Sequence, residues 1–318
     1  MQLPLATPIA LRPGARVAVL AASSPSRRER IETARDHLVA AGLEIVFADN
    51  LFSTGRSYLA GNDELRAAEF NRFLRDPSID GFFFARGGYG AMRILDRIDY
   101  AAFSNNPRPL VGFSDVTALN QALAVKTGVA SFHGPMLNTD FHDGLSPLQD
   151  RWLWSALSGE APMEFRYDQT QVISHGQASG ILFGGCLSIT LALLETPYDF
   201  WVQDGIWFWE DVDEPIYRID RMLTQLRLSG RLRNIRGVMI GKLKDCGVSD
   251  PDELDSLLSE FFSDSGIPVV RDLPFGHFAD NLLMPIGLPA ELDTTALTFT
   301  LPRPVTSAAV RSPGSLHR

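Results

Sequence analysis

The chain of 318 residues lacks several features that mark large protein classes. It has two cysteines, Cys186 and Cys246, and no Cys-x-x-Cys pair, which argues against a disulfide framework and a structural zinc site. No run rich in lysine and arginine occurs, so the footprint of a nucleic-acid-binding protein is missing. No run of about 18 apolar residues occurs either, so we expect no membrane span and no membrane partner.

The first eleven residues also lack a basic segment followed by a long apolar stretch. We therefore expect no secretory signal peptide and a cytoplasmic location. The net charge of −9 indicates mainly solubility. A hydrophobic content of 45% is sufficient for a sizeable core, and the length allows two domains.

Short apolar runs alternate with amphipathic helical patterns through the first half of the chain. Five runs predict buried strands: 16–22, 43–47, 81–85, 110–113 and 129–132. Strands that alternate with helices predict an α/β fold, with a mostly parallel, Rossmann-like sheet covered by helices on both faces. Ligands of such a sheet bind at the carboxyl ends of the strands.

The regular pattern loosens between about residues 158 and 177, where glycine, proline and scattered polar residues replace it. We place the boundary between two domains there. The predicted segments are an N-terminal domain (1–160), a linker (161–178), a smaller C-terminal α/β domain with β-barrel-like character (179–304) and a flexible tail (305–318).

Ser114 stands between an apolar run and a helical pattern. The run 110–113 predicts a strand, and a helix begins directly after the serine, with Val116, Leu119 and Leu123 on one face. A strand, a sharp turn that carries serine and a helix can present a nucleophile at the carboxyl edge of a sheet. The free N–H groups of the helix N-terminus suit an oxyanion. The alternative is that Ser114 only caps the helix.

Two further loops follow predicted strands. Residues 86–90 (RGGYG) contain three glycines, which allow either a tight turn or close approach of the backbone to a ligand, and they match no phosphate-binding pattern. Asp140, His142 and Asp143 are of the types that ligate metals. Their neighbours are those of an ordinary loop, so we predict no metal ion and no cofactor.

A serine nucleophile needs a base, and the base needs a carboxylate to orient it. His277 lies in a glycine-flanked loop, and Glu210 is the first acid after an aromatic strand. Taken singly, a loop histidine is more often an ordinary surface residue, and Glu210 is also compatible with a solvated acidic turn. The order Ser114, Glu210, His277 is that of α/β-hydrolases, but Val116 replaces the second glycine of G-x-S-x-G, so we do not expect that fold.

Six motifs, in order, resemble the LD-carboxypeptidase family of serine peptidases, which includes muramoyltetrapeptide carboxypeptidase and the microcin C immunity protein. The motifs are RGGYG (86–90), GFSDVT (112–117), FHGPM (132–136), LFGGCL (182–187), WEDVDEPIYRIDRMLTQLRLSG (209–230) and PFGHFADNLLMPIG (274–287). The resemblance covers nearly the whole chain. It implies a homodimer without metal, in which an α/β N-terminal domain carries the serine and a smaller domain carries Glu and His.

The resemblance implies that Ser114 is the nucleophile, His277 the general base and Glu210 the residue that orients His277. It also implies an oxyanion hole formed by the backbone N–H groups of Gly88 and Asp115.

Four further residues are expected to contact the substrate: Arg86, Gly87, Tyr89 and Cys186. The cysteine occupies the place of the family's asparagine, and a thiol is a poor substitute for an amide as a hydrogen-bonding group.

Three functions follow from these patterns. The first is a cytoplasmic carboxypeptidase that releases D-alanine from a murein tetrapeptide during peptidoglycan recycling. The second is an immunity-type hydrolase that cleaves aminoacyl- or peptidyl-nucleotide conjugates, for which a longer loop bearing a base-stacking aromatic is expected. The short loop 196–205 favours the first function over the second. The third is a binder of small ligands without catalysis, against which the intact Ser114, Glu210 and His277 argue.

Overall fold

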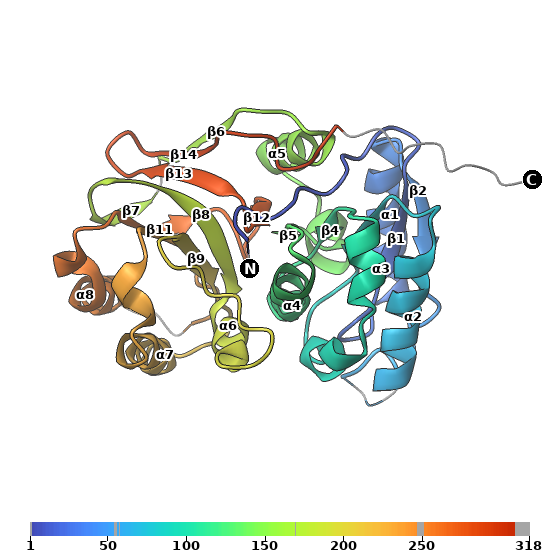
Figure 1. Ribbon diagram of the computed structural model, residues 1–318, viewed down its shortest axis with the longest axis horizontal. Coiled ribbons are helices and arrows are strands. Elements are labelled where there is room, and N and C mark those ends of the chain that lie inside the picture. The colour runs from blue at the N-terminus through green and yellow to red at the C-terminus, as the bar shows by residue number, and fades with distance from the viewer. Residues whose placement is uncertain (1, 54–55, 57, 169, 247–250, 309–318) are drawn as a thin grey trace, which may run out of the picture.

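A computed structural model describes residues 2–308, except 54, 55, 57, 169 and 247–250. Two α/β units lie side by side, the first blue to green and the second yellow to red (Figure 1). Within the described residues, none of the helices is both long and apolar enough to cross a bilayer.

The first unit is built on a six-stranded sheet of order β12-β5-β4-β3-β1-β2. The first five strands along the chain are parallel: β1 (Arg16–Leu20), β2 (Glu44–Phe47), β3 (Gly81–Phe84), β4 (Leu110–Val111) and β5 (Ser131–His133). The sixth strand, β12 (Met284–Ile286), pairs with β5 in the antiparallel direction. The predicted mostly parallel sheet is therefore confirmed, and a late segment of the chain completes its edge.

Helices of the first unit flank this sheet. They are α1 (Arg28–Ala40), α2 (Asp63–Arg75), α3 (Tyr100–Asn105), α4 (Thr117–Thr127) and α5 (Pro147–Ser158), with the 3₁₀ helices η1 (Ala91–Arg97) and η2 (Ser114–Val116) and the π-helix η3 (Leu137–Phe141). Helix α2 shows how the sequence sets these limits. Asn62 accepts a hydrogen bond from the N–H of Leu65 and caps the helix, and the helix ends before Pro77.

The second unit is built on an open eight-stranded sheet of order β6-β14-β13-β8-β9-β10-β11-β7. The central strands β8 (Gln177–Cys186), β9 (Ile206–Glu210), β10 (Gly237–Gly241) and β11 (Val269–Leu273) are parallel. The antiparallel strands are β6 (Met163–Arg166), β7 (Gln171–Ser174), β13 (Pro289–Asp293) and β14 (Thr298–Leu301). The helices are α6 (Leu187–Leu193), α7 (Ile216–Leu228), α8 (Pro251–Phe262), η4 (Arg231–Asn234) and η5 (Ser263–Ser265).

Two stretches differ in character from the sequence-based description. Residues 161–178, described above as a linker, contain β6, β7 and the start of β8, so this stretch belongs to the second sheet. Val305 and Thr306 fall in the expected flexible tail but are buried, and the Thr306 hydroxyl donates to the carbonyl of Ala156. The rest of that tail, 309–318, lies outside the described residues.

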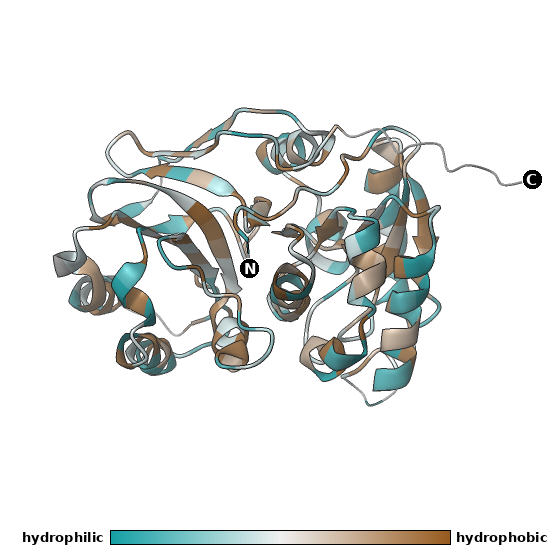
Figure 2. Cartoon of the chain, viewed as in Figure 1, coloured by the Kyte–Doolittle hydropathy of each residue, from teal (hydrophilic) through white to brown (hydrophobic). Residues whose placement is uncertain are grey.

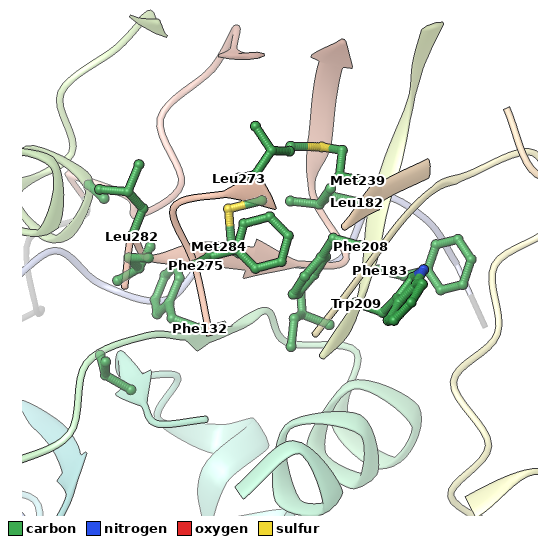
Figure 3. Close-up of a cluster of buried hydrophobic side chains, with 14 of the residues drawn as sticks. Phe132, Leu182, Phe183, Phe208, Trp209, Met239, Leu273, Phe275, Leu282 and Met284 are labelled. Atoms are coloured by element: carbon green, nitrogen blue, oxygen red, sulfur yellow. The ribbon is translucent and has the colours of Figure 1, made fainter. Parts of the chain in front are cut away.

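Helix α4 lies between the two units (Figure 1). Residues 117–124 of this helix are all buried, and in Figure 2 it is largely brown, whereas outer helices such as α2 carry much teal. One apolar cluster spans both units, with Phe132 of β5 beside Phe275 and Met284 (Figure 3). Burial of this shared core holds the two sheets together, so residues from both can meet at one site.

Candidate active site

Ser114 occupies a strained turn at the carboxyl end of β4. Its φ angle is +60°, which is uncommon for a residue other than glycine. The residue is half-buried and begins η2, which leads directly into α4. The Ser114 hydroxyl donates no hydrogen bond to another described residue. The backbone N–H of Asp115 also has no hydrogen-bond partner among the described residues. A strand, a left-handed serine and a helix form the arrangement known from nucleophile elbows.

The loop 86–90 faces this serine. A methyl group built on Gly87 would lie 2.9 Å from Ser114 Cβ, 3.0 Å from Ser114 Oγ and 3.3 Å from the nitrogen of Asp115. Glycine at position 87 therefore leaves open the space next to the hydroxyl and the free N–H. The N–H groups of Gly87 and Gly88 likewise donate to no described residue.

Contacts with three neighbouring segments fix the glycine loop. The N–H of Ser24 donates to the carbonyl of Gly87 (3.2 Å), and a methyl group on Gly88 would overlap the Ser24 hydroxyl. The buried Arg66 donates to the carbonyl of Gly90 (2.8 Å). The carboxylate of Asp115 accepts from the N–H of Ala91 (2.8 Å), just past the loop.

Asp115 therefore acts twice, through its backbone beside Ser114 and through its carboxylate under the loop. The carboxylate also accepts from the Ser23 hydroxyl (2.5 Å). Burial raises the pKa of Asp115 above its usual value, although these hydrogen bonds act in the opposite direction. Sequence reasoning assigned only the backbone of this residue and missed the carboxylate.

Glu210, the last residue of β9, forms a close pair with His277, which lies in the loop after β11. His277 Nδ1 lies 2.6 Å from Glu210 Oε2, and the backbone N–H of His277 donates to the same oxygen (3.2 Å). Glu210 is fully buried, and 17% of the His277 side chain is exposed. Glycines allow this close approach, because a methyl group on Gly276 would lie 2.5 Å from Glu210 Cγ and one on Gly241 2.9 Å from Glu210 Cβ.

The opposite charges of Glu210 and His277 shift the pKa of both side chains. Burial alone would raise the pKa of Glu210, but the charge of His277 and its hydrogen bond hold that pKa below its usual value. Burial alone would lower the pKa of His277, but the charge of Glu210 and its hydrogen bond raise it above 6.5. The attraction and the hydrogen bond between Glu210 and His277 cause both pKa shifts. Glu210 therefore stays ionised and fixes the orientation of the imidazole.

The Glu210–His277 pair contacts Phe113, the residue directly before Ser114. The ring of Phe113 packs edge-to-face on His277, with ring centroids 4.8 Å apart. The three residues that the sequence singled out thus come from both units, and the Phe113–His277 contact places the neighbour of Ser114 against the Glu210–His277 pair. The arrangement can support attack by a serine hydroxyl that a histidine deprotonates.

The other predicted substrate contacts differ in accessibility. Arg86 is exposed, and its guanidinium reaches the carbonyl of Pro25 at 3.5 Å. Tyr89 is 49% exposed and packs on Tyr58, with ring centroids 5.9 Å apart. Cys186, by contrast, is buried.

The thiol of Cys186 lies 3.5 Å from Asp211 Oδ1 and 3.4 Å from Ser188 Oγ. Burial, with the charge of Asp211, raises its pKa well above 9.0, so the thiol is protonated near neutral pH. Asp140, one of the possible metal ligands, instead accepts from Met136 N–H and the Thr139 hydroxyl. No group of three or more potential ligands is arranged around a metal site in the described residues.

Comparison with known proteins identifies the family. Residues 17–134 match the N-terminal domain of LD-carboxypeptidases, and residues 179–292 match the C-terminal domain. The chain belongs to the LD-carboxypeptidase family. It is 39% identical to a Streptomyces coelicolor protein over 98% of this chain and 99% of that protein. It is 32% identical to a probable murein peptide carboxypeptidase of Bacillus subtilis, over 96% of this chain and 97% of that protein.

Solved structures agree with this assignment. Muramoyltetrapeptide carboxypeptidase of Oxalobacter formigenes superposes with a TM-score of 0.79 at 29% identity, covering 90% of this chain and 97% of that chain. The structure of MccF with glutamyl sulfamoyl guanosine gives a TM-score of 0.86 at 22% identity, covering 95% and 99%. At that identity the likeness shows a shared fold. The family and its named relatives support a serine-type carboxypeptidase.

Proposed function

We propose that this protein is a serine LD-carboxypeptidase that releases the terminal D-alanine of a murein tetrapeptide in peptidoglycan recycling. The observation that carries the proposal is the 2.6 Å contact between His277 and the buried Glu210, packed through Phe113 against the strained Ser114. The relative named murein peptide carboxypeptidase supports this choice of substrate.

In the proposed mechanism, Ser114 Oγ attacks the carbonyl carbon of the last peptide bond, and His277 Nε2 takes the hydroxyl proton. The carbonyl oxygen becomes an oxyanion, which the N–H of Asp115 and those of Gly87 and Gly88 stabilise. His277 then gives its proton to the leaving amine, and D-alanine departs. Water, deprotonated by the same imidazole, cleaves the ester and restores the serine.

A carboxypeptidase must also recognise the free carboxylate of its last residue. Arg86 supplies a suitable cation, because it is exposed, has no ion pair among the described residues and precedes Gly87. In the proposal its guanidinium binds the terminal carboxylate. The variant Arg86→Gln should therefore raise KM about 10- to 100-fold for the tetrapeptide, and much less for its C-terminal amide.

The alternative substrate is an aminoacyl- or peptidyl-nucleotide, as the fold shared with MccF suggests. The loop between α6 and β9 argues against it, because its aromatic side chains are already engaged. Phe200 is buried, Trp201 packs between Phe183 and Trp207, and Tyr198 packs on Tyr100. These rings are poorly placed to stack on a nucleobase.

The deciding experiment measures D-alanine release from tetrapeptide with and without its disaccharide, for the wild type and for Ser114→Ala. We expect release by the wild type and none by the variant. Release that persists in Ser114→Ala would refute the nucleophile. Cleavage of a peptidyl-nucleotide with no turnover of tetrapeptide would establish the alternative.

The proposal includes a homodimer in the cytoplasm, as the resemblance implies. Light scattering coupled to size-exclusion chromatography tests the dimer, with a mass near twice the 35.1 kDa of the chain as the expected result. Cell fractionation tests the location.

A further inference from the structure

His133 lies at the end of β5, and no part of the mechanism above uses it. Its side chain is fully buried, and neither ring nitrogen has a hydrogen-bond partner among the described residues. Burial holds the pKa of His133 at about 4, so the imidazole is neutral near pH 7, with one N–H donor and one acceptor nitrogen. A buried polar group without a partner destabilises a fold unless it has another role.

The neighbours of His133 connect it to all three proposed catalytic residues. Its ring packs on Phe113 and Phe208, each at a centroid separation of 5.5 Å, and on Phe275 at 6.4 Å. Phe113 directly precedes Ser114. Phe208 and Phe275 each stand two residues before Glu210 and His277, respectively. We call these three phenylalanines the aromatic cage.

A second unpaired polar atom lies in the same region. Glu210 Oε2 receives both hydrogen bonds from His277, but Oε1 of the same buried carboxylate has no partner among the described residues. The charge of Glu210 raises the pKa of His133, against the larger and opposite effect of burial. The two side chains therefore interact electrostatically across a region of low polarity.

We propose that His133 is a positioning residue, whose ring N–H is directed toward the free carboxylate oxygen of Glu210 and keeps that carboxylate oriented toward His277. The aromatic cage holds the imidazole in place and excludes competing polar groups. His133 thus acts on the reaction through Glu210, without touching the substrate. Its kinetic consequence rests on the proposed function, but its effect on the Glu210–His277 pair does not.

The test compares His133→Leu with His133→Gln, two side chains of similar size of which only glutamine has an N–H donor. We expect His133→Leu to lower kcat for D-alanine release about 10- to 100-fold, with KM changed less than about threefold. Its melting temperature should stay close to that of the wild type, because leucine removes the interaction with Glu210 but also removes the second ring nitrogen, which has no partner. We expect His133→Gln to retain kcat within about fivefold.

A spectroscopic measurement needs no substrate. The proton between His277 Nδ1 and Glu210 Oε2 should give a downfield proton NMR signal in the wild type and in His133→Gln, and a shifted or missing signal in His133→Leu. An unchanged signal in a folded His133→Leu would overturn the inference even if the enzyme has another substrate. An equal loss of kcat in His133→Leu and His133→Gln would overturn the inference too. It would mean that the shape of the imidazole, and not its N–H donor, determines the rate. If His133→Leu does not fold, His133→Phe, which keeps a ring in the cage, takes its place with the same expectations.

Discussion

The substitution Gly87→Ala tests the geometry around Ser114 with a single methyl group. The added carbon would lie 2.9 Å from Ser114 Cβ and 3.3 Å from the Asp115 nitrogen, whereas ordinary contacts of such carbons begin at 3.4 Å. The φ angle of Gly87 is outside the left-handed region, so alanine introduces no backbone strain there. The serine must therefore move by about half an ångström, or the loop must withdraw.

Either response disturbs the proposed oxyanion hole. Loss of one such donor lowers kcat about 10²- to 10³-fold, or about 2.7–4 kcal/mol of transition-state stabilisation. A comparable displacement of a reacting group has a similar effect. We therefore expect kcat/KM for D-alanine release to fall at least 100-fold in Gly87→Ala, with a melting temperature within a few degrees of the wild type.

The assay pairs this rate with the rate at which a fluorophosphonate labels Ser114, which depends on the same nucleophile and donors but needs no knowledge of the substrate. Gly237→Ala is the matched control, because its methyl group would meet Ala178 Cβ and a Pro268 side-chain carbon at 3.3 Å, also without a left-handed φ. A Gly87→Ala enzyme that keeps both rates within threefold would refute the proposed position of the oxyanion.

Three further predictions follow from individual groups. Since a general base must be neutral and Glu210 raises the pKa of His277, kcat/KM should fall as the pH drops through a midpoint above 6.5; a midpoint below 6.5 would contradict the pairing. Because Cys186 and Cys246 are buried and burial raises both thiol pKa values, iodoacetamide should leave activity unchanged in the native enzyme, and rapid inactivation would implicate a thiol. Asn62→Ala should lower the free energy of unfolding in urea by about 1 kcal/mol through loss of the α2 cap, with kcat unaffected.

The sequence indicates a helix or strand well where neighbouring residues mark its limits. Helix α2 has its own cap, Asn62, and ends just before Pro77, so its limits are marked in the local sequence. The buried strands of the first sheet are short apolar runs, which a parallel sheet covered on both faces requires. Strand β12 was missed, because it has three residues and contains Pro285. Proline is tolerated there only because β12 is the edge of its sheet, which the sequence does not reveal.

The position of strands at sheet edges also explains why residues 161–178 were expected to be a linker but contain strands. Strands β6 and β7 form the two edges of the second sheet, and their mixed polar sequences, MEFR and QVIS, resemble a loop. Each gains its partner, β14 or β11, from a segment more than 90 residues away along the chain. Such pairing leaves no local signal.

In the candidate site, too, some residues have a local sequence signal and others depend on contacts with distant segments. Ser114, Glu210 and His277 could be named from motifs, because the chemistry needs those residue types at strand ends. The carboxylate of Asp115 and the ring of His133 act through contacts with distant segments, and an aspartate after a serine or a histidine after a strand has many ordinary explanations. Only their burial and their neighbours distinguish them.

The two units are in direct contact next to Ser114 and next to the strand end that carries Glu210. A methyl group on Gly185 would lie 2.6 Å from Thr117 Cγ2, and the N–H of Cys186 donates to the Thr117 hydroxyl (3.1 Å). Thr117 is the first residue of α4, directly after the turn that holds the serine, and Cys186 pairs with Glu210 between β8 and β9. The backbone of the second unit therefore packs against the start of the helix that follows the Ser114 turn of the first unit. If Ser114 and His277 have the proposed roles, this contact restricts how the two residues can move relative to each other before a substrate binds, a form of preorganisation.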